Sequence, residues 1–370
     1  MLQVLKNKKP TVGRDVRLDG VRVILMLLVI GIHSSMDALA DLSLSKTALV
    51  SFLFICDGGF FALSGYFMLN KELHTGIEYL QFYLKRIITV IVPALLLHPT
   101  LDILFYRHVF SIGWKAYIHA YIENVLVNDF YSPLWFVYSY IALVLGAPFM
   151  AKLLNHLSKK ELLILAAVTL CYQLTVDICD IKCWSFRFGG YWIGSWTMYF
   201  IGGFYLRKFR EEIKKYRLVF YGLGLAAYVF IVHRLYTSNG ILGPANMLQT
   251  SFYLTFILCA IVFIINQVAF EKVAWLSAGV TFLAKHSYTI YLTHSNIIGS
   301  TYEKTNKLLG MMHIAPDSGA GNLLSYVFNV VFAILFAVLY DEIFLFRIQD
   351  LLRHLLKPVL EKKTMKEETL

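Results

Sequence analysis

The chain consists mainly of long apolar runs separated by short polar segments. An α-helix needs about 20 mostly apolar residues to cross a hydrocarbon core of about 30 Å, and runs of this length recur along the sequence. Strands of a membrane β-barrel would alternate apolar and polar residues over about ten positions, and these runs do not. The pattern predicts an all-α integral membrane protein, a polytopic bundle of about ten transmembrane helices. The predicted spans are roughly 20–38, 47–69, 82–105, 133–154, 160–178, 189–207, 217–235, 247–266, 279–299 and 322–346.

The composition agrees with a membrane protein. Hydrophobic residues make up 58% of the 370 residues and charged residues only 16%, whereas a soluble domain has about 25% charged residues to cover its surface. The longest gap between spans, 106–132, is too short for a soluble domain, and it contains the amphipathic segment SIGWKAYIHAYIENVLV, typical of a helix along the membrane interface. We therefore expect one membrane domain over 17–348, flanked by an N-terminal tail (1–16) and a basic C-terminal tail (349–370).

The basic residues gather in every second polar segment. The net charge is +10, and the segment RKFREEIKKYR at 207–217 alone holds six basic residues. Because basic loops stay on the cytoplasmic side, the distribution predicts that both termini are cytoplasmic in a multi-pass cell-membrane protein. The positive charge is then explained by the membrane topology of the chain and by contact of its basic segments with anionic lipid. No nucleic-acid-binding motif is present, so we expect no nucleic-acid partner.

Two ionisable residues lie inside the first predicted span, where charges are costly and suggest a function. Arg22 and His33 are eleven residues apart, which on an α-helix places them within about 20° of one face and about 16 Å apart along the axis. Histidine can accept and return a proton near neutral pH, and arginine binds phosphate or carboxylate. The alternative is that Arg22 extends to the membrane surface and His33 forms a structural hydrogen bond between helices.

The next two spans carry further candidates. Ser64 and Gly65 in FFALSGYFML allow two helices to approach closely, an ordinary packing feature in membranes. The third predicted helix opens with FYLKRIITVIVP, which would place Lys85 and Arg86 at the positive end of its dipole, suited to a phosphate. The alternative is a basic anchor at the inner face. Pro93 removes one helical hydrogen bond and is expected to kink this span.

The ninth predicted span contains two histidines. His286 and His294 are eight residues apart, near one helix face, with His294 deep in the membrane. They have no accompanying carboxylate and cysteine ligands, so we expect no metal site. No hydrolase, metalloprotease or nucleotide-binding motif stands in a suitable context.

Five segments resemble, in order, motifs of the integral-membrane acyltransferase 3 family, and together they extend over nearly the whole chain. They are RLDGVRVILMLLVIGIH, FFALSGYFML, FYLKRIITVIVP, SPLWFVYSYIALVLGAP and HSYTIYLTH. The first looks like the family's arginine, ten residues and histidine, and the second like its Ser-Gly-aromatic motif. The others are similar to its basic third helix, its Trp-Phe segment and its Tyr-Leu-x-His segment. The resemblance implies transfer of an acyl group, usually acetyl from cytoplasmic acetyl-CoA, to a glycan hydroxyl.

The resemblance also implies roles for single residues. His33 would be the essential histidine, Arg22 its partner, and Arg86 the first basic position of the third helix, with Lys85 beside it. Three carboxylates are unranked candidates for orienting His33: Asp19, Asp37 and Asp57. The residues in or beside the matching motifs are Asp19, Ser64, Gly65, Tyr66, Trp135 and His294.

The chain departs from the family pattern in three places. Thr89 stands at the second basic position of the third helix, and Tyr138 and Tyr140 stand where the O-antigen-modifying branch has Ser-x-Glu. Asp57 stands one residue earlier than that branch's aspartate. The chain is more similar to the stand-alone branch that includes enterobacterial common antigen and capsule acetyltransferases.

The leading hypothesis is an O-acetyltransferase acting on a bacterial surface polysaccharide or its lipid-linked precursor. Acetyl-CoA would be the acyl donor and not a resident cofactor, with its phosphates near Arg86, Lys85 and Arg22, and His33 would act as general base or as a covalent carrier. One alternative is a proton-coupled transporter of a small molecule or glycan, since buried Arg and His also serve transport, although no inverted repeat supports it. The other is a non-catalytic partner in a polysaccharide assembly complex.

Overall fold

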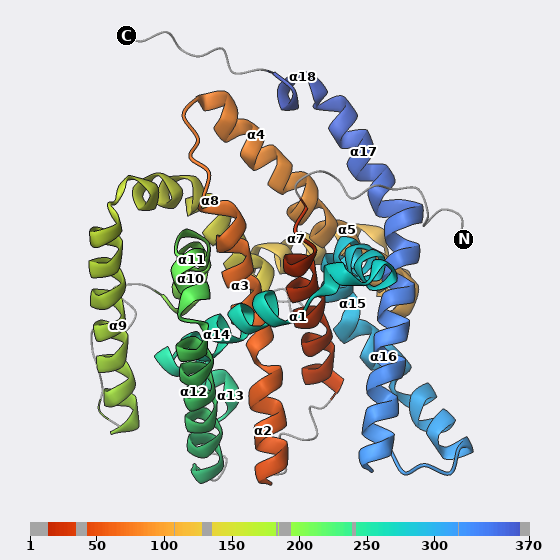
Figure 1. Ribbon diagram of the computed structural model, residues 1–370. Coiled ribbons are helices and arrows are strands. Elements are labelled where there is room, and N and C mark those ends of the chain that lie inside the picture. Colours follow the sequence, from red (N-terminus) through yellow and green to blue (C-terminus); the bar gives the residue numbers. More distant parts are fainter. Residues whose placement is uncertain are drawn as a thin grey trace. The chain divides into compact units, whose positions relative to one another are not determined.

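The computed structural model describes residues 14–34, 43–106, 108–127, 135–182, 184, 194–238, 242–316 and 318–362. Every regular element in these ranges is a helix (Figure 1), which confirms the predicted all-α class. The α-helices are α1 (Val16–Ser34), α2 (Leu44–Leu53), α3 (Ile55–Met68), α4 (Gly76–Arg86), α5 (Val92–Leu101), α6 (His108–Ile112), α7 (Trp114–Val127), α8 (Trp135–His156), α9 (Lys159–Ile181), α10 (Ser195–Lys208), α11 (Arg210–Lys215), α12 (Arg217–Thr237), α13 (Pro244–Met247), α14 (Ser251–Gln267), α15 (Ala274–Met311), α16 (Gly319–Tyr340), α17 (Phe346–Leu355) and α18 (Lys357–Leu360). The π-helices η3 (Ile87–Ile91), η4 (Asp102–Tyr106) and η6 (Asp341–Leu345) and the 3₁₀-helix η5 (Phe270–Lys272) connect some of them.

Among the described residues, seven helical stretches are long and apolar enough to cross a membrane. Three further predicted spans correspond to α1, to α10 and to part of α15, which continues to Met311. α1 carries charged residues near its start, and α10 is described over only 14 residues. The count of ten spans and the cytoplasmic termini therefore stay predictions. The seven stretches are Leu44–Met68, Gly76–Leu104, Trp135–His156, Lys159–Cys179, Arg217–Thr237, Ser251–Lys272 and Gly319–Leu355.

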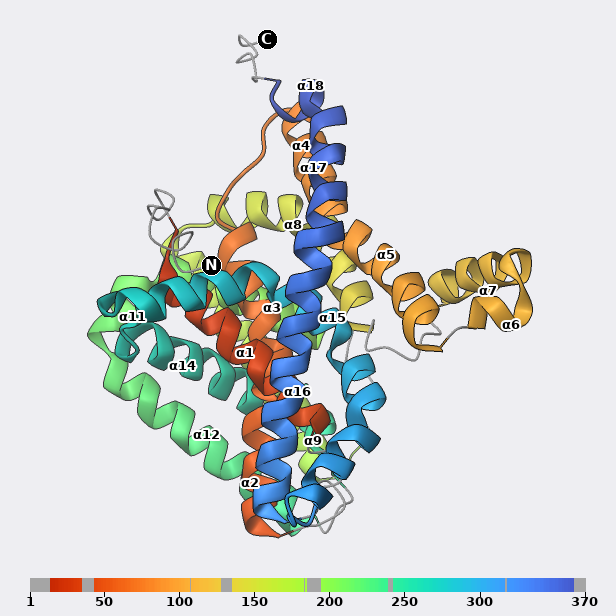
Figure 2. The same cartoon turned by 90° about the vertical axis from the view of Figure 1, so that its right-hand side faces the viewer.

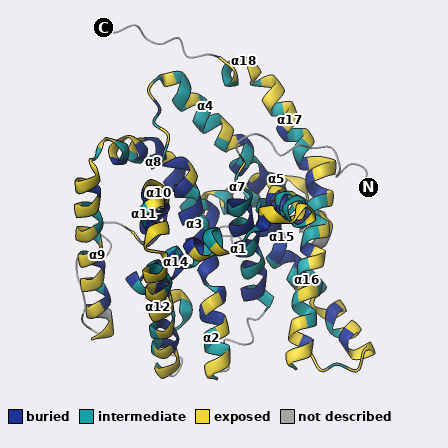
Figure 3. Cartoon of the chain, in the orientation of Figure 1, coloured by how far each residue is buried: buried dark blue, intermediate teal, exposed yellow. Residues whose placement is uncertain are grey.

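Many large apolar residues of these stretches are exposed, and exposed residues are prominent on α9 and α12 (Figure 3). On α12, Leu218, Leu225 and Val229 are 75%, 64% and 58% exposed. Such a surface is unfavourable in water and suits contact with lipid chains. The exposed apolar faces therefore agree with a multi-pass membrane protein.

The chain divides into two compact units that interleave along the sequence. Unit 1 comprises Met1–Asn70 and Leu157–Tyr288, and unit 2 comprises Lys71–His156 and Thr289–Leu370. α15 contributes its first part to unit 1 and its second part to unit 2.

The core of unit 1 is a close contact between α3 and α10. A Cβ atom on Gly65 would lie 1.7 Å from the carbonyl oxygen of Phe200, and one on Gly203 would lie 1.7 Å from the carbonyl oxygen of Ala62. The two backbones therefore touch at both glycines, the close approach that small residues allow between membrane helices. The adjacent Ser64 hydroxyl donates to the carbonyl of Phe60 at 2.7 Å, so its hydrogen bond is made within its own helix.

In unit 2, α4 and the α17–α18 segment lie side by side (Figure 1). Gln81 on α4 donates through Nε2 to the carbonyl oxygens of Val359 and Lys362, at 3.0 and 2.9 Å. Further along the same pair, Gln349 on α17 reaches the carbonyl of Ile88 in η3, at 3.0 Å. These contacts bind the two helical segments along their length.

The described part of the predicted amphipathic segment, 108–127, is helical. α6 and α7 extend from the end of η4 (Figure 2). Tyr117 is buried, and the Tyr121 hydroxyl donates to the carbonyl of Leu95 at 2.7 Å. Burial, with a smaller contribution from Tyr138, raises the pKa of Tyr121 to about 12, so this hydroxyl remains protonated and able to donate. An adjacent face carries an exposed apolar stripe made of Trp114, Ile118, Ile122 and Leu126.

Candidate functional site

Arg22 and His33 lie on one uninterrupted α-helix, α1. The predicted geometry therefore holds: the two residues share a helix face and are separated by about 16 Å along the axis. Both residues are half-buried. A fixed cation and a titratable base are thus presented along one stripe of unit 1.

Asp19 organises the beginning of α1. Its carboxylate is buried, with the residue only 5% exposed, and it accepts a hydrogen bond from Nε of Arg14. Nη1 of Arg22 lies 3.6 Å from the other carboxylate oxygen. Asp19 is fourteen residues before His33 on the same helix, or about 21 Å along the axis, so it does not orient His33. Its role is to hold two guanidinium groups.

The Ser-Gly-Tyr-Phe motif of α3 lies against two of the arginines. The Arg22 guanidinium is 5.8 Å from the ring centre of Phe67, and the Arg207 guanidinium is 5.6 Å from that of Tyr66. Arg207 also donates through Nη1 to the carbonyl of Tyr66 at 3.3 Å. Such contacts hold a guanidinium over an aromatic face, an arrangement that is compatible with anion binding.

We call Arg14, Asp19 and Arg22 the arginine cluster. Its two cations face one carboxylate, an excess that suits a phosphate or carboxylate ligand. Arg207 lies against the neighbouring Tyr66 of the α3 motif. The sequence pattern marks Arg207 only as part of the basic segment 207–217. The signal that would have found Arg207 is its place at the end of a predicted span, where an arginine can reach an aromatic motif of a neighbouring helix.

In unit 2, the position of Lys85 and Arg86 corrects one prediction. The helix that carries them begins at Gly76, with a capping box formed by Thr75 and Glu78, so the two cations lie in its last turn. The expectation that they stand at a positive helix end beside free N–H groups is therefore wrong. Residues 76–81 are polar enough to look like a loop, and the Thr-x-x-Glu pattern was the available sign of a helix start.

Arg86 is nevertheless held in a defined place. Its guanidinium lies 5.4 Å from the ring centre of Phe82, and its buried Nε has no hydrogen-bond partner among the described residues. Lys85 beside it is exposed. An anion could therefore complete the hydrogen bonding of Arg86, with Lys85 adding charge.

The backbone directly after Arg86 is a π-helix, and the kink at Pro93 stays a prediction. In η3, the N–H of Val92 donates to the carbonyl of Ile87, which leaves the Ile88 carbonyl without its usual helical donor. Pro93 follows and supplies no N–H to the preceding turn. The buried side chain of Gln349 donates to the Ile88 carbonyl at 3.0 Å, so the π-turn is satisfied from another helix.

Replacing Gln349 with leucine is expected to destabilise the protein by about 1–3 kcal/mol, because it leaves the buried Ile88 carbonyl unsatisfied. The measurement is thermal or denaturant unfolding of the purified protein in detergent. Gln81→Leu is the matched control, since Gln81 also donates to backbone carbonyls but at a partly exposed position, and it should cost less. Equal losses for the two variants would contradict this role of Gln349.

The Trp-Phe and Tyr-Leu-x-His motifs meet in unit 2. The ring of Phe136, next to Trp135, lies 5.0 Å from that of Tyr291, and Tyr291 lies 5.6 Å from the imidazole of His294. His294 is fully buried, and its Nδ1 is hydrogen-bonded to the carbonyl of Tyr291. That bond assigns the proton to Nδ1 and fixes the orientation of the ring.

The remaining candidates are placed only in part. Cys56 Sγ lies 3.7 Å from a carboxylate oxygen of Asp57 on α3, while Asp37 lies outside the described residues. Unit 1 brings together Asp19 and Arg22, and it places the Arg22 guanidinium over Phe67, the residue next to Tyr66. Unit 2 brings together Trp135 and His294, through Phe136 and Tyr291.

A family model described as "Acyltransferase domain" matches residues 15–342. The match begins one residue before α1 and ends within η6, so it includes both Arg22 and His33 and all five motifs. No curated protein and no solved structure matches the chain.

Proposed function

The chain belongs to the acyltransferase 3 family, and from this premise we propose that it moves an acetyl group from cytoplasmic acetyl-CoA to a hydroxyl of a bacterial surface polysaccharide or its lipid-linked precursor. The family and the seven apolar helical stretches together identify a membrane acyltransferase. The acetyl donor, the glycan acceptor and the cell membrane as the location are the proposed part.

The observation that carries the proposal is the α1 stripe with His33 and Arg22 on one face. His33 would take the proton from the acceptor hydroxyl while the hydroxyl oxygen attacks the thioester carbonyl carbon. The new C–O bond forms, the C–S bond breaks, and CoA leaves as a thiolate that receives the proton from His33. A histidine that first carries the acetyl group covalently would use the same residue and the same donor.

The donor's phosphates need cations to bind them. We assign this role to Arg86 and Lys85, with Arg22 as a further candidate. A guanidinium binds phosphate through parallel charge-assisted hydrogen bonds. The arginine cluster supports the part given to Arg22, because Asp19 and Phe67 fix its guanidinium at one end of the α1 stripe.

Arg86→Ala is expected to raise the KM for acetyl-CoA about 10- to 100-fold, because it removes charge-assisted hydrogen bonds of about 1.5–3 kcal/mol, and to leave kcat nearly unchanged. Arg86→Lys should lie between the wild type and alanine. The measurement is steady-state transfer at varied donor concentration. Arg347→Ala, at an exposed position on the neighbouring α17 segment, is the control, and a KM equal to the wild-type value in Arg86→Ala would remove Arg86 from the donor site.

The cellular test compares the surface glycans of cells with and without the gene by NMR. O-acetyl signals should be present only with the gene, and a His33→Ala gene should not restore them. Unchanged acetyl signals in the deletion would refute a glycan acceptor.

A further inference from the structure

The π-helix η3 separates Arg86 from the rest of its apolar stretch in unit 2. Arg86 ends α4, η3 follows directly, and α5 continues the stretch. A π-turn contains one residue more than an α-turn, and each residue of an α-helix turns the chain by about 100°. The turn at η3 therefore determines the direction in which Arg86 points relative to α5.

Pro93 determines which carbonyl near this turn lacks a backbone donor. In an uninterrupted α-helix, which we call the α-register, it would be the carbonyl of Thr89, because Pro93 has no N–H. In η3 the N–H of Val92 donates to Ile87 instead, so the carbonyl of Ile88 loses its usual donor and Pro93 supplies none. We call this pattern the π-register.

Gln349 supplies the donor that the π-register lacks. Its Nε2 lies 3.0 Å from the carbonyl oxygen of Ile88, and the residue is only 6% exposed. A buried carbonyl without a donor is costly. Because the α-register would return Ile88 to Val92, the bond from Gln349 stabilises the π-register selectively.

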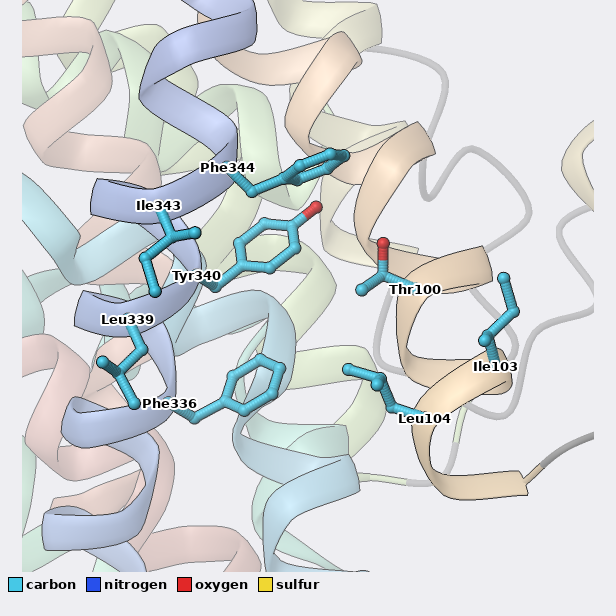
Figure 4. Close-up of a pocket in the computed structure, with 8 residues that line it drawn as sticks. All are labelled: Thr100, Ile103, Leu104, Phe336, Leu339, Tyr340, Ile343 and Phe344. Carbon is cyan, nitrogen blue, oxygen red and sulfur yellow. The ribbon is translucent and has the colours of Figure 1, made fainter.

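α5 is held in place independently of Gln349. The hydroxyls of Tyr340 and Thr100 are hydrogen-bonded beside an apolar pocket between α16–η6 and α5–η4 (Figure 4), and Tyr121 donates to the backbone of α5 at 2.7 Å. α4 is held to α18 by Gln81, but at a partly exposed position. If the bond from Gln349 is lost, we therefore expect α4 to turn and α5 to stay.

We propose that Gln349 is a positioning residue for the donor site, because its bond to Ile88 keeps η3 in the π-register and Arg86 in its half-buried place. In the α-register, each residue of α4 would take the place that the preceding residue now holds. Arg86 would then move to the exposed place of Lys85, and Lys85 to the half-buried place of Leu84. The inference rests on the proposed function only where it assigns Arg86 to the donor.

The first test needs no donor. Arg86→Cys and Lys85→Cys are made separately in the full-length protein, reconstituted in lipid nanodiscs and treated with a water-soluble thiol reagent. Labelled peptides are quantified by mass spectrometry. Adding Gln349→Leu should make labelling faster at position 86 and slower at position 85. Unchanged rates at both positions would overturn the proposal, whatever the protein does with acetyl-CoA.

The second test asks whether Gln349 acts through Arg86. Gln349→Leu should raise the KM for acetyl-CoA about tenfold, the value of one charge-assisted hydrogen bond, and leave kcat nearly unchanged. Added to Arg86→Ala, it should raise KM no further, because the residue that it positions is already gone. A further tenfold rise would show that Gln349 acts elsewhere and would overturn the proposal. An unchanged KM in Arg86→Ala would instead refute the proposed donor site itself.

A double variant separates positioning from stability. Pro93→Ala restores the N–H that Thr89 needs in the α-register, so Pro93→Ala combined with Gln349→Leu leaves that register without a missing donor. Its unfolding temperature should return towards the wild-type value, whereas its KM for acetyl-CoA should stay about tenfold raised. A KM that returns to the wild-type value together with the stability would overturn the positioning role of Gln349.

Discussion

Replacing His33 with alanine is expected to lower acyl transfer about 10²- to 10⁴-fold, the usual contribution of a general base. The variant loses the imidazole on the face of α1 that His33 shares with Arg22. The measurement is transfer of labelled acetyl from acetyl-CoA by the purified, reconstituted protein. The loss should fall on kcat, because the donor's phosphates are bound elsewhere.

A control separates catalysis from folding. His233→Ala removes an exposed histidine of unit 1 on α12 and should keep wild-type transfer. Unfolding temperatures of both variants should match the wild type, and added imidazole should restore part of the lost activity in His33→Ala. Wild-type transfer by a correctly inserted His33→Ala protein would remove His33 from the reaction.

The second large effect is on folding. Gly65→Ala is expected to destabilise the protein by at least about 3 kcal/mol, at or beyond the upper end of ordinary overpacking. The new methyl group would lie 1.7 Å from the carbonyl oxygen of Phe200, and backbone cannot rotate away as a side chain can. Fluorescence-detected size exclusion after heating in detergent would show the drop in unfolding temperature.

A second glycine provides the matched control. A Cβ atom on Gly222, in α12 of the same unit, would meet nothing within 4 Å. Gly222→Ala should therefore leave the unfolding temperature unchanged or raise it slightly, since alanine favours the helix. If Gly65→Ala is as stable as Gly222→Ala, α3 and α10 do not touch at this glycine.

The fold was predictable where a single physical effect, such as burial in lipid, determines which residues a segment can contain. Burial in lipid demands long apolar helices, so the all-α class follows from the apolar runs alone. The amphipathic α7 followed from its period, since Trp114, Ile118 and Ile122 recur every fourth residue. Spacing was also sufficient for Arg22 and His33, because a continuous helix fixes both angle and rise.

Other features depend on contacts that hydropathy does not record. The start of α4 is polar, so the apolar pattern begins several residues after the helix does. The predicted start of the helix was therefore too late, and Lys85 and Arg86 were assigned to the wrong end of its dipole. The π-turn at η3 depends on Gln349, which lies 261 residues from Ile88 in the chain. Arg207 joined the site only through Tyr66, on a helix far away in the sequence. Each of these needed tertiary structure.

Acetyl transfer is tested most directly by a mass balance with the purified, reconstituted protein, labelled acetyl-CoA and a glycan acceptor. We expect label to enter the acceptor and one CoA to be released for each acetyl group transferred. Movement of a solute across the bilayer without CoA release would instead indicate a transporter. Absence of both transfer and release in the presence of acceptor would contradict the assignment of acetyl-CoA as donor.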